Sequence, residues 1–491
     1  MTKADRPPHT RIVATVGPAC DDAKTLAKLA EGGVDVFRLN LSHGSLEGHL
    51  DTLTSIRAIE RTLATPLAVL ADLPGPKVRM TGSARDRLLP GESLRLLAER
   101  PSGGNQSSWI AIPTTAVLAS LSPGHRVLLD DGQIRLIVTA VHGAEVECRV
   151  LNGGSLRPRI GVNVPDSDPD LQVVTETDLR YAKAMKEAGC DFIAVSFCRD
   201  GGDLRGLREA LAATPGRMPR LVAKVERPSA VEHLSDIVEA CDVVLVARGD
   251  LGVEMDLSSV PVIQKEIVAA SIRGGKPVIV ATQMLQSMIE SPTPTRAEAT
   301  DAANAVIDGA DALMLSGETA IGRYPVLSVE MLRRIASRTE RWLDAGPRPR
   351  PIDDRLEVSM NEDDPWLAGL VAGVDDVVRR LGAAAVVGWT TSGETARLIS
   401  RGRLRVPLVM LTDDEVTARS MRMLAGVRPV LADADPGAGD AFIRIADEAI
   451  RNLELVESGA PVVFLHGSGR RESRPTDVLG VFEAGSGWGR S

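Results

Sequence analysis

The sequence predicts an α/β protein in three parts: a (β/α)8 barrel, an all-β domain inserted after its third strand, and an open α/β domain towards the C-terminal end. Three observations support this prediction. Short, almost continuously apolar runs alternate with amphipathic stretches, which is typical of parallel strands covered by helices. The interval between the third and fourth runs changes to short alternating pieces with Asp-Gly turns. A charged, Pro-rich segment near residue 350 precedes the last part.

Eight apolar runs are expected to form the barrel strands: RIVATV, VDVFRLN, LAVLADL, DFIAVSF, RLVAKVE, DVVLVARGD, KPVIVATQ and DALMLSGE. Helical stretches such as AKTLAKLAEGG and DLRYAKAMKEAGC lie between them. Eight such units suggest closure into a TIM barrel, in which active sites gather at the carboxyl ends of the strands. We assign residues 1–79 and 170–343 to this barrel.

The two other parts follow from changes in the pattern. Residues 80–169 contain pieces such as SLRLLAER and RVLLDDGQIRLIVTAV, and we expect a β domain that stands over the barrel mouth as a lid. The segment DAGPRPRPIDDRLEVSMNEDDP predicts a linker over 344–365. The runs AAAVVGWT, VPLVMLT, VRPVLA and PVVFLHG then predict the open α/β domain over 366–491.

Composition narrows the functional classes. The net charge of −9 over 491 residues is mild, and only 3% of residues are aromatic, so a nucleic-acid partner is not indicated. The five cysteines show no CxxC spacing, which indicates a reducing compartment. The start MTKADRPPHTR has no apolar signal core, and no run approaches the ~18 apolar residues of a membrane span. We expect a cytoplasmic protein without membrane contact.

Polar side chains stand where the predicted strands end. Lys224 and Glu226 are two residues apart in RLVAKVE, so an extended strand projects them to one face. Taken alone, such a pair also fits a solvated ion pair. The ends of other runs carry further polar residues: Arg38, Asn40, Asp72, Asp250, Thr282, Ser316 and Glu318. Polar groups on this many strand ends favour a functional site.

Two of these residues suit a magnesium ion. Glu226 and Asp250 close consecutive strands, and Mg²⁺ binds through one or two carboxylates together with water and substrate oxygens. The alternative is that both carboxylates cap helices. Gly249 favours the site, because it permits a tight turn before a short helix. Lys224 beside such a metal would be a fixed charge for a phosphoryl group or an enolate.

The chain resembles the pyruvate kinase family across the whole barrel. The residues that carry the resemblance are TRIVATVGPAC, VFRLNLSHGS, DLPGPKVR, GVNVP, LVAKVERP, VLVARGDLGVE, GKPVIVATQMLQSM and PTRAEATDAANAVIDGADALMLSGETAIGRYP. The resemblance implies transfer of a phosphoryl group from phosphoenolpyruvate to ADP, giving pyruvate and ATP in glycolysis. It also implies dependence on Mg²⁺, with Mn²⁺ as a substitute, and a homotetramer in which Arg296 and the helices after it lie at a subunit interface.

The resemblance also implies roles for single residues. Lys224 would stabilise the transferring phosphoryl group and the enolate, Arg38 would bind the substrate phosphate, and Glu226 and Asp250 would hold Mg²⁺. The substrate carboxylate would bind the backbone of Ala247, Arg248 and Gly249 and the hydroxyl of Thr282. Asp250 would also contact the substrate. On the route that protonates the enolate the resemblance places Thr282, Ser316 and Glu318.

Cation and nucleotide sites are implied in the same way. The family's monovalent-cation site corresponds here to Asn40, Ser42, Asp72 and Leu73, and its nucleotide contacts to His43 and Arg79. Many members read Asp-Thr-Lys-Gly-Pro-Glu where this chain reads DLPGPK, so Leu73 and Lys77 depart from the pattern. A lysine ammonium can stand in for K⁺. We therefore expect K⁺-independent catalysis, as in the lysine-bearing branch of the family.

Two further departures concern the nucleotide side. Thr177 stands where the family usually has a lysine near the phosphates, and Gly48 where a tyrosine is often found. They support a rival interpretation, a catalytically weakened paralogue that binds metabolites as a regulatory protein. A second rival is carbon–carbon lyase chemistry in the same enolate pocket. Against the first rival, a decayed enzyme has no need of Lys224, Glu226, Asp250 and Thr282 all together. Against the second, a lyase has no use for Arg79.

A loop in the last domain is a candidate effector site. TTSGETA, residues 390–396, precedes a helix and resembles the family's phosphate loop, with candidate ligands Thr391, Ser392, Gly393 and Thr395. The alternative is ordinary helix capping by Thr391 or Ser392. If the loop binds an effector, we expect a sugar phosphate or a nucleoside monophosphate.

Overall fold

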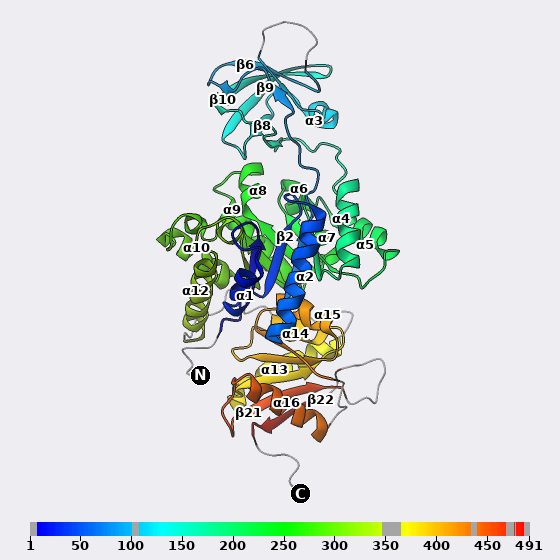
Figure 1. The fold of residues 1–491 in the computed structure, drawn as a ribbon, viewed down its shortest axis with the longest axis vertical. Coiled ribbons are helices and arrows are strands. Elements are labelled where there is room, and N and C mark those ends of the chain that lie inside the picture. The colour runs from blue at the N-terminus through cyan, green and yellow to red at the C-terminus, as the bar shows by residue number, and fades with distance from the viewer. Residues whose placement is uncertain are drawn as a thin grey trace.

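The computed structural model describes residues 7–100, 108–345, 365–433, 439–467, 476 and 478–485. Figure 1 shows three blocks along the long axis, with the all-β domain at one end, the barrel in the middle and the C-terminal domain at the other end. The predicted fold class is confirmed. The linker predicted over 344–365 lies almost entirely outside the described residues, and the exact domain boundaries stay predictions.

The central block is a closed barrel of parallel strands in the order β1-β17-β16-β15-β14-β13-β3-β2. Their bounds are β1 (Arg11–Val16), β2 (Val36–Asn40), β3 (Ala68–Asp72), β13 (Phe192–Val195), β14 (Arg220–Val225), β15 (Val243–Ala247), β16 (Val278–Ala281) and β17 (Ala312–Leu315). Each strand lies within one of the eight predicted runs. The prediction succeeds because strands buried on both faces are almost wholly apolar.

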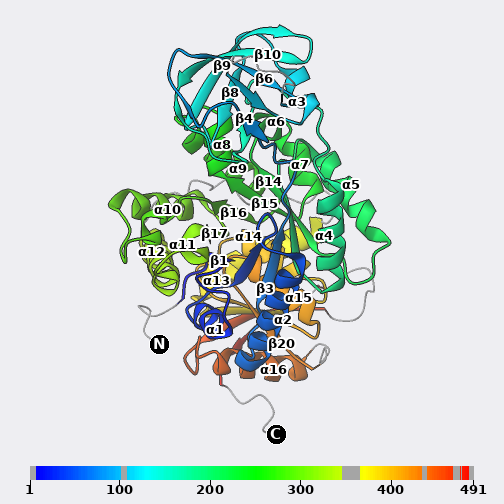
Figure 2. The same cartoon turned by 45° about the horizontal axis from the view of Figure 1, so that its top comes forward.

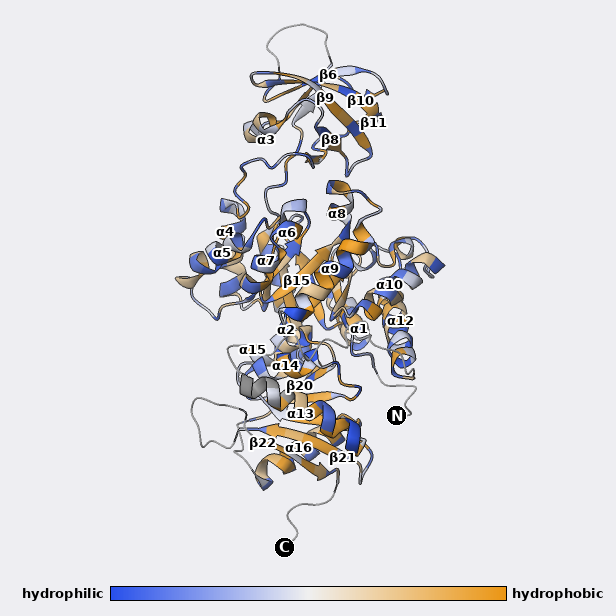
Figure 3. Ribbon diagram, turned by 180° about the vertical axis from the view of Figure 1, so that it is seen from behind, coloured by the Kyte–Doolittle hydropathy of each residue, from blue (hydrophilic) through white to orange (hydrophobic). Residues whose placement is uncertain are grey.

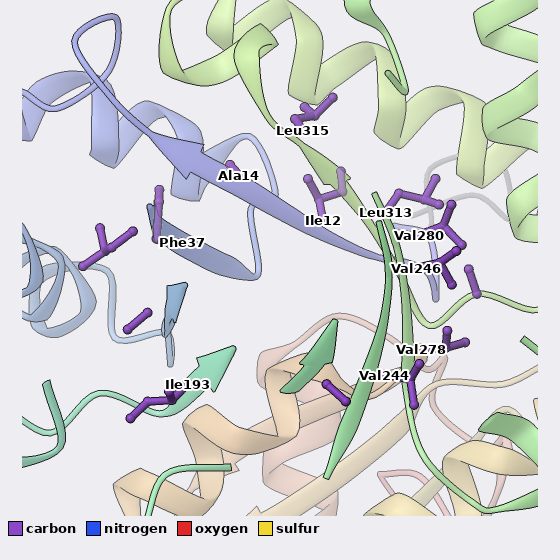
Figure 4. Close-up of a cluster of buried hydrophobic side chains, with 14 of the residues drawn as sticks. Ile12, Ala14, Phe37, Ile193, Val244, Val246, Val278, Val280, Leu313 and Leu315 are labelled. Carbon is purple, nitrogen blue, oxygen red and sulfur yellow. The ribbon is translucent and has the colours of Figure 1, made fainter. Parts of the chain in front are cut away.

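Helices surround these strands. They are α1 (Ala23–Glu31), α2 (Leu46–Leu63), α4 (Glu176–Glu187), α5 (Gly201–Ala212), α6 (Pro228–Glu232), α7 (Leu234–Ala240), α8 (Arg248–Glu254), α9 (Val260–Arg273), the 3-10 helix η1 (Gln286–Ile289), α10 (Arg296–Asp308), α11 (Gly317–Ala320) and α12 (Pro325–Ala345). Side chains from alternate strand positions, such as Ile12, Val244 and Val280, point outward and build the core between strands and helices (Figure 4). None of the helices in the described ranges is long and apolar enough to cross a membrane.

The inside of the barrel has its own core. Inward-facing residues such as Leu70, Val222 and Ile279 pack together, and Met423 of the C-terminal domain belongs to the same cluster. The hydropathy colouring in Figure 3 shows apolar strands at the centre with more polar helices outside them. Met423 lies beside Phe192 and Val243, the first residues of β13 and β15, so it closes the barrel at the amino ends of the strands.

The all-β domain is inserted between β3 and α4. Its main sheet has the order β12-β8-β9-β10-β6-β7-β4, and β11 pairs with β5. The elements are β4 (Gly82–Ser83), β5 (Arg87–Leu88), β6 (Ser93–Leu97), β7 (Trp109–Ala111), α3 (Thr115–Ser120), β8 (Arg126–Leu129), β9 (Ile134–His142), β10 (Glu145–Asn152), β11 (Gly154–Ser155) and β12 (Val162–Asn163). Figure 2, in which this domain comes forward, shows it over the barrel end that carries α6 and α8.

The C-terminal domain is an open sheet in the order β20-β19-β18-β21-β22. Its elements are α13 (Pro365–Leu381), β18 (Ala385–Trp389), α14 (Glu394–Arg401), β19 (Leu408–Thr412), α15 (Glu415–Ser420), the 3-10 helix η3 (Met421–Met423), β20 (Val427–Leu431), α16 (Asp440–Asn452), β21 (Pro461–His466) and β22 (Val478–Glu483). Four strands match the predicted runs. The fifth, β22, was not predicted, and it pairs antiparallel with β21 at the sheet edge.

Buried ion pairs join this domain to the barrel. The fully buried Asp35 accepts a hydrogen bond of 3.0 Å from Arg11 and lies 2.7 Å from the Arg422 guanidinium. The Arg11 Nε atom also donates to the Leu424 carbonyl at 2.8 Å. Burial alone would raise the pKa of Asp35, but Arg422 and Arg11 hold it below its usual range. The carboxylate is therefore ionised and links both domains.

Candidate active site

Lys224 lies at the carboxyl end of β14, within the barrel mouth. Its Nζ atom is 2.7 Å from Ser196 Oγ, 2.8 Å from Glu226 Oε1 and 3.3 Å from Asp72 Oδ1. Burial alone would lower the pKa of Lys224, but Asp72 and Glu226 raise it well above its usual range. The geometry thus places a permanent ammonium charge among oxygen atoms at the end of the strand.

Arg38 approaches the same point from β2. Its guanidinium makes two contacts of 2.7 Å with Asp72 Oδ2 and donates to Thr15 Oγ1 at 2.9 Å. Burial would raise the pKa of Asp72, whereas Lys224 and Arg38 lower it below its usual range. Asp72 therefore bridges and orients the two cations that the sequence predicts at the substrate phosphate.

Glu226 and Asp250 fit a magnesium ion in their chemistry. Glu226 is fully buried, and its Oε2 atom accepts a hydrogen bond of 2.7 Å from Phe197 N. Its Oε1 atom lies 2.8 Å from Lys224 Nζ but receives no well-directed hydrogen bond. Burial raises the pKa of Glu226 to about 7, against the lowering effect of Lys224. Asp250 is close enough to add to that shift, and a cation between two such carboxylates would relieve it.

In the described part of the chain, no group of three or more His, Cys, Asp or Glu residues could hold a metal ion. The site at Glu226 and Asp250 has two carboxylates. Mg²⁺ keeps several waters and binds substrate oxygens in addition to one or two carboxylates. The donor set present therefore suits Mg²⁺ bound together with a substrate.

The loop after β16 meets the first turn of α8. Thr282 Oγ1 accepts a hydrogen bond of 2.8 Å from Gly249 N and donates to the Ala281 carbonyl at 2.7 Å. Thr282 has φ of 69°, a left-handed conformation that a β-branched residue rarely adopts. The Arg248 side chain is occupied: it contacts Asp301 at 2.7 Å and donates to the carbonyls of Ala281 at 3.2 Å and Thr282 at 2.7 Å. Only the backbone of Arg248 is thus available beside the Thr282 hydroxyl.

Glu318 explains how the Thr282 loop keeps this shape. It is fully buried, and its two carboxylate oxygens accept hydrogen bonds from Leu285 N at 2.9 Å and Ser316 N at 2.8 Å. Both bonds are to backbone groups, one in each of the loops after β16 and β17. Glu318 therefore positions the two loops, and Ser316 lies beside it as the sequence predicts.

The four residues predicted for a monovalent cation are only partly together. Asn40 pairs in register with Asp72, and its side chain accepts a hydrogen bond of 3.2 Å from Ser42 N. Leu73 is buried, while the Asp72 carboxylate is taken by Arg38 and Lys224. Lys77 is exposed and lines a small cavity with Asp250 at the seam between lid and barrel. The K⁺ prediction is not tested by this arrangement.

The predicted nucleotide residues lie at the outer edge of the mouth. His43 is exposed in the loop after β2, and Gly48 lies in the first turn of α2. Arg79 donates to the Arg159 carbonyl at 2.9 Å and so joins the two chain segments that enter and leave the lid. Thr177 is exposed in the first turn of α4.

The candidate effector loop lies at the other end of the barrel. Gly393, with φ of 82°, is the N-terminal cap residue of α14. Thr391 accepts a hydrogen bond from Thr417 through its carbonyl, and the Ser392 carbonyl accepts one of 3.1 Å from Arg220. Thr395 pairs with Thr476 at 3.0 Å. Ser392 Oγ accepts a hydrogen bond of 3.4 Å from Glu394 N, the first residue of α14, so Ser392 contributes the predicted capping contact, whereas Thr391 contacts the loop through its carbonyl.

Three residues of the site were missed by the sequence prediction. Ser196 binds Lys224, Thr15 orients Arg38, and Phe197 N holds Glu226. Ser196 and Phe197 follow the end of β13, a strand whose carboxyl end we had left without a role. The rule that active-site groups gather at strand ends gives enough signal to find Ser196, whereas the Phe197 contact is made by its backbone.

A barrel mouth with two cations, a pair of carboxylates and a loop-held hydroxyl is typical of the class of enzymes that stabilise phosphoryl and enolate charge. A family model described as "Pyruvate kinase, barrel domain" matches residues 7–329, and "Pyruvate kinase, alpha/beta domain" matches 370–482. The chain belongs to the pyruvate kinase family.

Curated relatives support this conclusion. A pyruvate kinase of Agrobacterium vitis is 40% identical over 477 residues, which cover 97% of this chain and 96% of the relative. That of Methylorubrum extorquens is 38% identical over 94% of each chain. That of Corynebacterium glutamicum is 35% identical, covering 96% of this chain and 97% of the relative. The chain is thus a phosphotransferase, and neither rival interpretation is favoured.

Proposed function

We propose that the barrel mouth transfers the phosphoryl group of phosphoenolpyruvate to ADP with the residue roles predicted from the sequence. The observation that supports this most is the Lys224 ammonium, held among Ser196, Asp72 and Glu226 at a strand end. In this position it stabilises negative charge on the phosphoryl oxygens and then on the enolate oxygen. Arg38 binds the substrate phosphate from the adjacent side of Asp72.

The substrate carboxylate binds where α8 begins. The Gly249 N–H, now bonded to Thr282 Oγ1, is the donor that turns to the carboxylate together with the backbone of Ala247 and Arg248. The Thr282 hydroxyl then stands next to the enolate and relays a proton from solvent water to its carbon, so that the hydroxyl is restored, while Glu318 holds the loop. Mg²⁺ bound by Glu226 and Asp250, for which Mn²⁺ can substitute, would neutralise charge on the phosphoryl and enolate oxygens.

Metal removal tests these carboxylate roles. We expect pyruvate formation from phosphoenolpyruvate and ADP to stop with a chelator and to return with Mg²⁺ or Mn²⁺, because few protein ligands give reversible binding. Glu226→Gln should raise the Mg²⁺ concentration for half-maximal rate at least about tenfold, since one charged ligand is lost. The matched variant Glu254→Gln alters a buried carboxyl at the C-terminal end of α8 that accepts a hydrogen bond from Asn163, and it should leave this concentration unchanged.

We propose K⁺-independent catalysis, supported by Lys77 in place of the usual glutamate. At constant ionic strength, replacing K⁺ by a large organic cation is expected to change kcat by less than about twofold, because the lysine charge is permanent. Lys77→Glu should make the rate depend on added K⁺. Equal rates of Lys77→Glu with and without K⁺ would contradict the assignment.

Three further proposals concern the location of the enzyme, its oligomeric state and its regulation. The enzyme acts in the cytoplasm, consistent with five free, buried cysteines. It assembles as a homotetramer, with Arg296 and α10 at one interface. A phosphorylated effector binds at Thr391, Ser392, Gly393 and Thr395, where a left-handed glycine opens a helix. A panel of sugar phosphates and nucleoside monophosphates in the activity assay tests the last point.

A further inference from the structure

Arg227 follows the metal carboxylate Glu226 and has no described role. Its side chain is only 12% exposed, yet its one ion pair among the described residues is a long contact of 3.9 Å with Asp168, which is itself 60% exposed. The guanidinium also lies 5.9 Å from the centre of the Phe197 ring. No hydrogen bond satisfies its five donors in the described part of the chain. None of its nitrogen atoms is among the buried polar atoms without a partner, so the guanidinium is open to solvent and its donors are free to bind an anion.

Other arginines buried to the same degree are paired. Arg38, 11% exposed, contacts Asp72 at 2.7 Å, and Arg248, 12% exposed, contacts Asp301 at 2.7 Å. Arg419, 10% exposed, contacts Asp191 at 2.9 Å. Arg227 differs from them, because no carboxylate lies within hydrogen-bond distance of its guanidinium. Burial raises the pKa of Glu254 and the Arg227 charge opposes this shift, so Glu254 is influenced only at longer range.

The cavity beside Arg227 shows where an anion bound by its guanidinium would lie. Two cations, Arg227 and Lys77, and three carboxylates line one cavity of about 30 Å³ between the barrel and the lid, the carboxylates being Asp131, Asp250 and Glu254. This volume suits a single water molecule, so the seam is narrow where the lid segment carrying Asn163 passes over it. Asp250 is one of the two carboxylates assigned to Mg²⁺. An anion held here would therefore lie beside a metal-bound phosphate.

One cation that the family resemblance leads us to expect on this side of the site is absent. Thr177 replaces the lysine that usually serves the nucleotide phosphates, and it lies in the first turn of α4. The next residue, Asp178, accepts a hydrogen bond of 3.1 Å from Gly75 N, so this turn adjoins the loop that carries Lys77. Thr177 therefore lies beside the loop whose Lys77 lines the same cavity as Arg227.

We propose that Arg227 binds a phosphate oxygen of the nucleotide and supplies the charge that Thr177 does not. The inference rests on the proposed function, because it assumes ADP as the second substrate. A guanidinium offers paired donors to a phosphate and is well suited to this task. The guanidinium lies 5.9 Å from the centre of the Phe197 ring, at the outer limit of a cation–π contact, and Phe197 N in turn donates to Glu226.

Kinetics of single and double variants test the proposal. We expect Arg227→Gln to raise the KM for ADP by about ten- to a hundredfold, as loss of one charged phosphate contact would, with the KM for phosphoenolpyruvate changed less than about twofold. Arg227→Lys should retain part of the affinity. Adding Thr177→Lys to Arg227→Gln should reverse at least about a third of the increase in the logarithm of the KM for ADP. Arg199→Gln is the matched control, since Arg199 lies nearby but is already paired with Asp203.

Each outcome has one meaning. Unchanged KM for ADP in Arg227→Gln, or equal changes for both substrates, would overturn the proposal, as would an Arg199→Gln effect of the same size. Binding of Mg-ADP measured by calorimetry provides a second readout for variants with altered stability, and unchanged binding would also overturn it. If the unsubstituted enzyme forms no pyruvate, the proposed function fails, while weaker ADP binding by Arg227→Gln would still support the contact.

Discussion

Replacement of Lys224 by methionine is expected to lower kcat at least about a thousandfold, the scale seen when a preorganised charge at a reacting centre is removed. Methionine matches the length of the lysine stem but carries no charge. The ammonium lies within 3.3 Å of Asp72, Glu226 and Ser196, so it contacts the site where charge develops. Steady-state pyruvate formation in a coupled assay measures the effect.

The same variant distinguishes loss of chemistry from loss of binding. Arg38 keeps its two contacts with Asp72 when Lys224 is removed, so phosphoenolpyruvate should still bind, with an affinity reduced by less than about tenfold. Lys276→Met is the matched control, because Lys276 donates to the Cys241 carbonyl at 2.7 Å at the opposite end of the barrel. Substantial turnover by Lys224→Met would contradict the central role of this lysine.

Asp35→Ala is expected to lower the free energy of unfolding by about 3–5 kcal/mol, the usual cost of leaving a buried charge without its partner. Asp35 is the carboxylate that neutralises both Arg11 and Arg422, and all three side chains are at most 10% exposed. Urea unfolding followed by circular dichroism measures the change. Asp376→Asn, which removes an exposed pair with Arg380, should cost less than about 1 kcal/mol.

Acidification should reproduce part of this effect. The pKa of Asp35 is lower in the folded protein than in the unfolded chain, so its contribution is present above the unfolded value of about 4 and is lost as the pH falls through the folded value. The variant Asp35→Ala should therefore lose less stability on acidification than the unsubstituted protein. Parallel pH profiles of the two proteins would contradict this account.

The barrel was predictable because its strands are local sequence features. Each is a short apolar run, and strands alternate with helices along the barrel sequence except where the lid is inserted after β3. The edge strand β22 was missed, because VLGVFE is brief, contains a glycine and stands at the sheet edge. A strand of this kind depends on pairing with β21 rather than on its own pattern.

The site was predictable to the extent that residues occupy strand ends. Lys224, Glu226 and Asp250 follow from that rule, and their charges interact in the structure. The partners that orient them were not predictable in the same way. Three-dimensional proximity decides that Thr15 contacts Arg38. It also decides that the nearest carboxylate to Arg227 lies 3.9 Å away. Sequence spacing carries no information on whether a given arginine has found a carboxylate.

The position of Met423 has a consequence for how the catalytic part of the chain evolved and could be engineered. A barrel that borrows a side chain to close its lower end is not a self-sufficient module. Excising the segment up to α12 would open a hole in its apolar interior and leave Asp35 without Arg422. The C-terminal domain therefore completes the apolar interior of the barrel. Exchanging this domain between relatives requires a side chain in the place of Met423 that fits the new barrel.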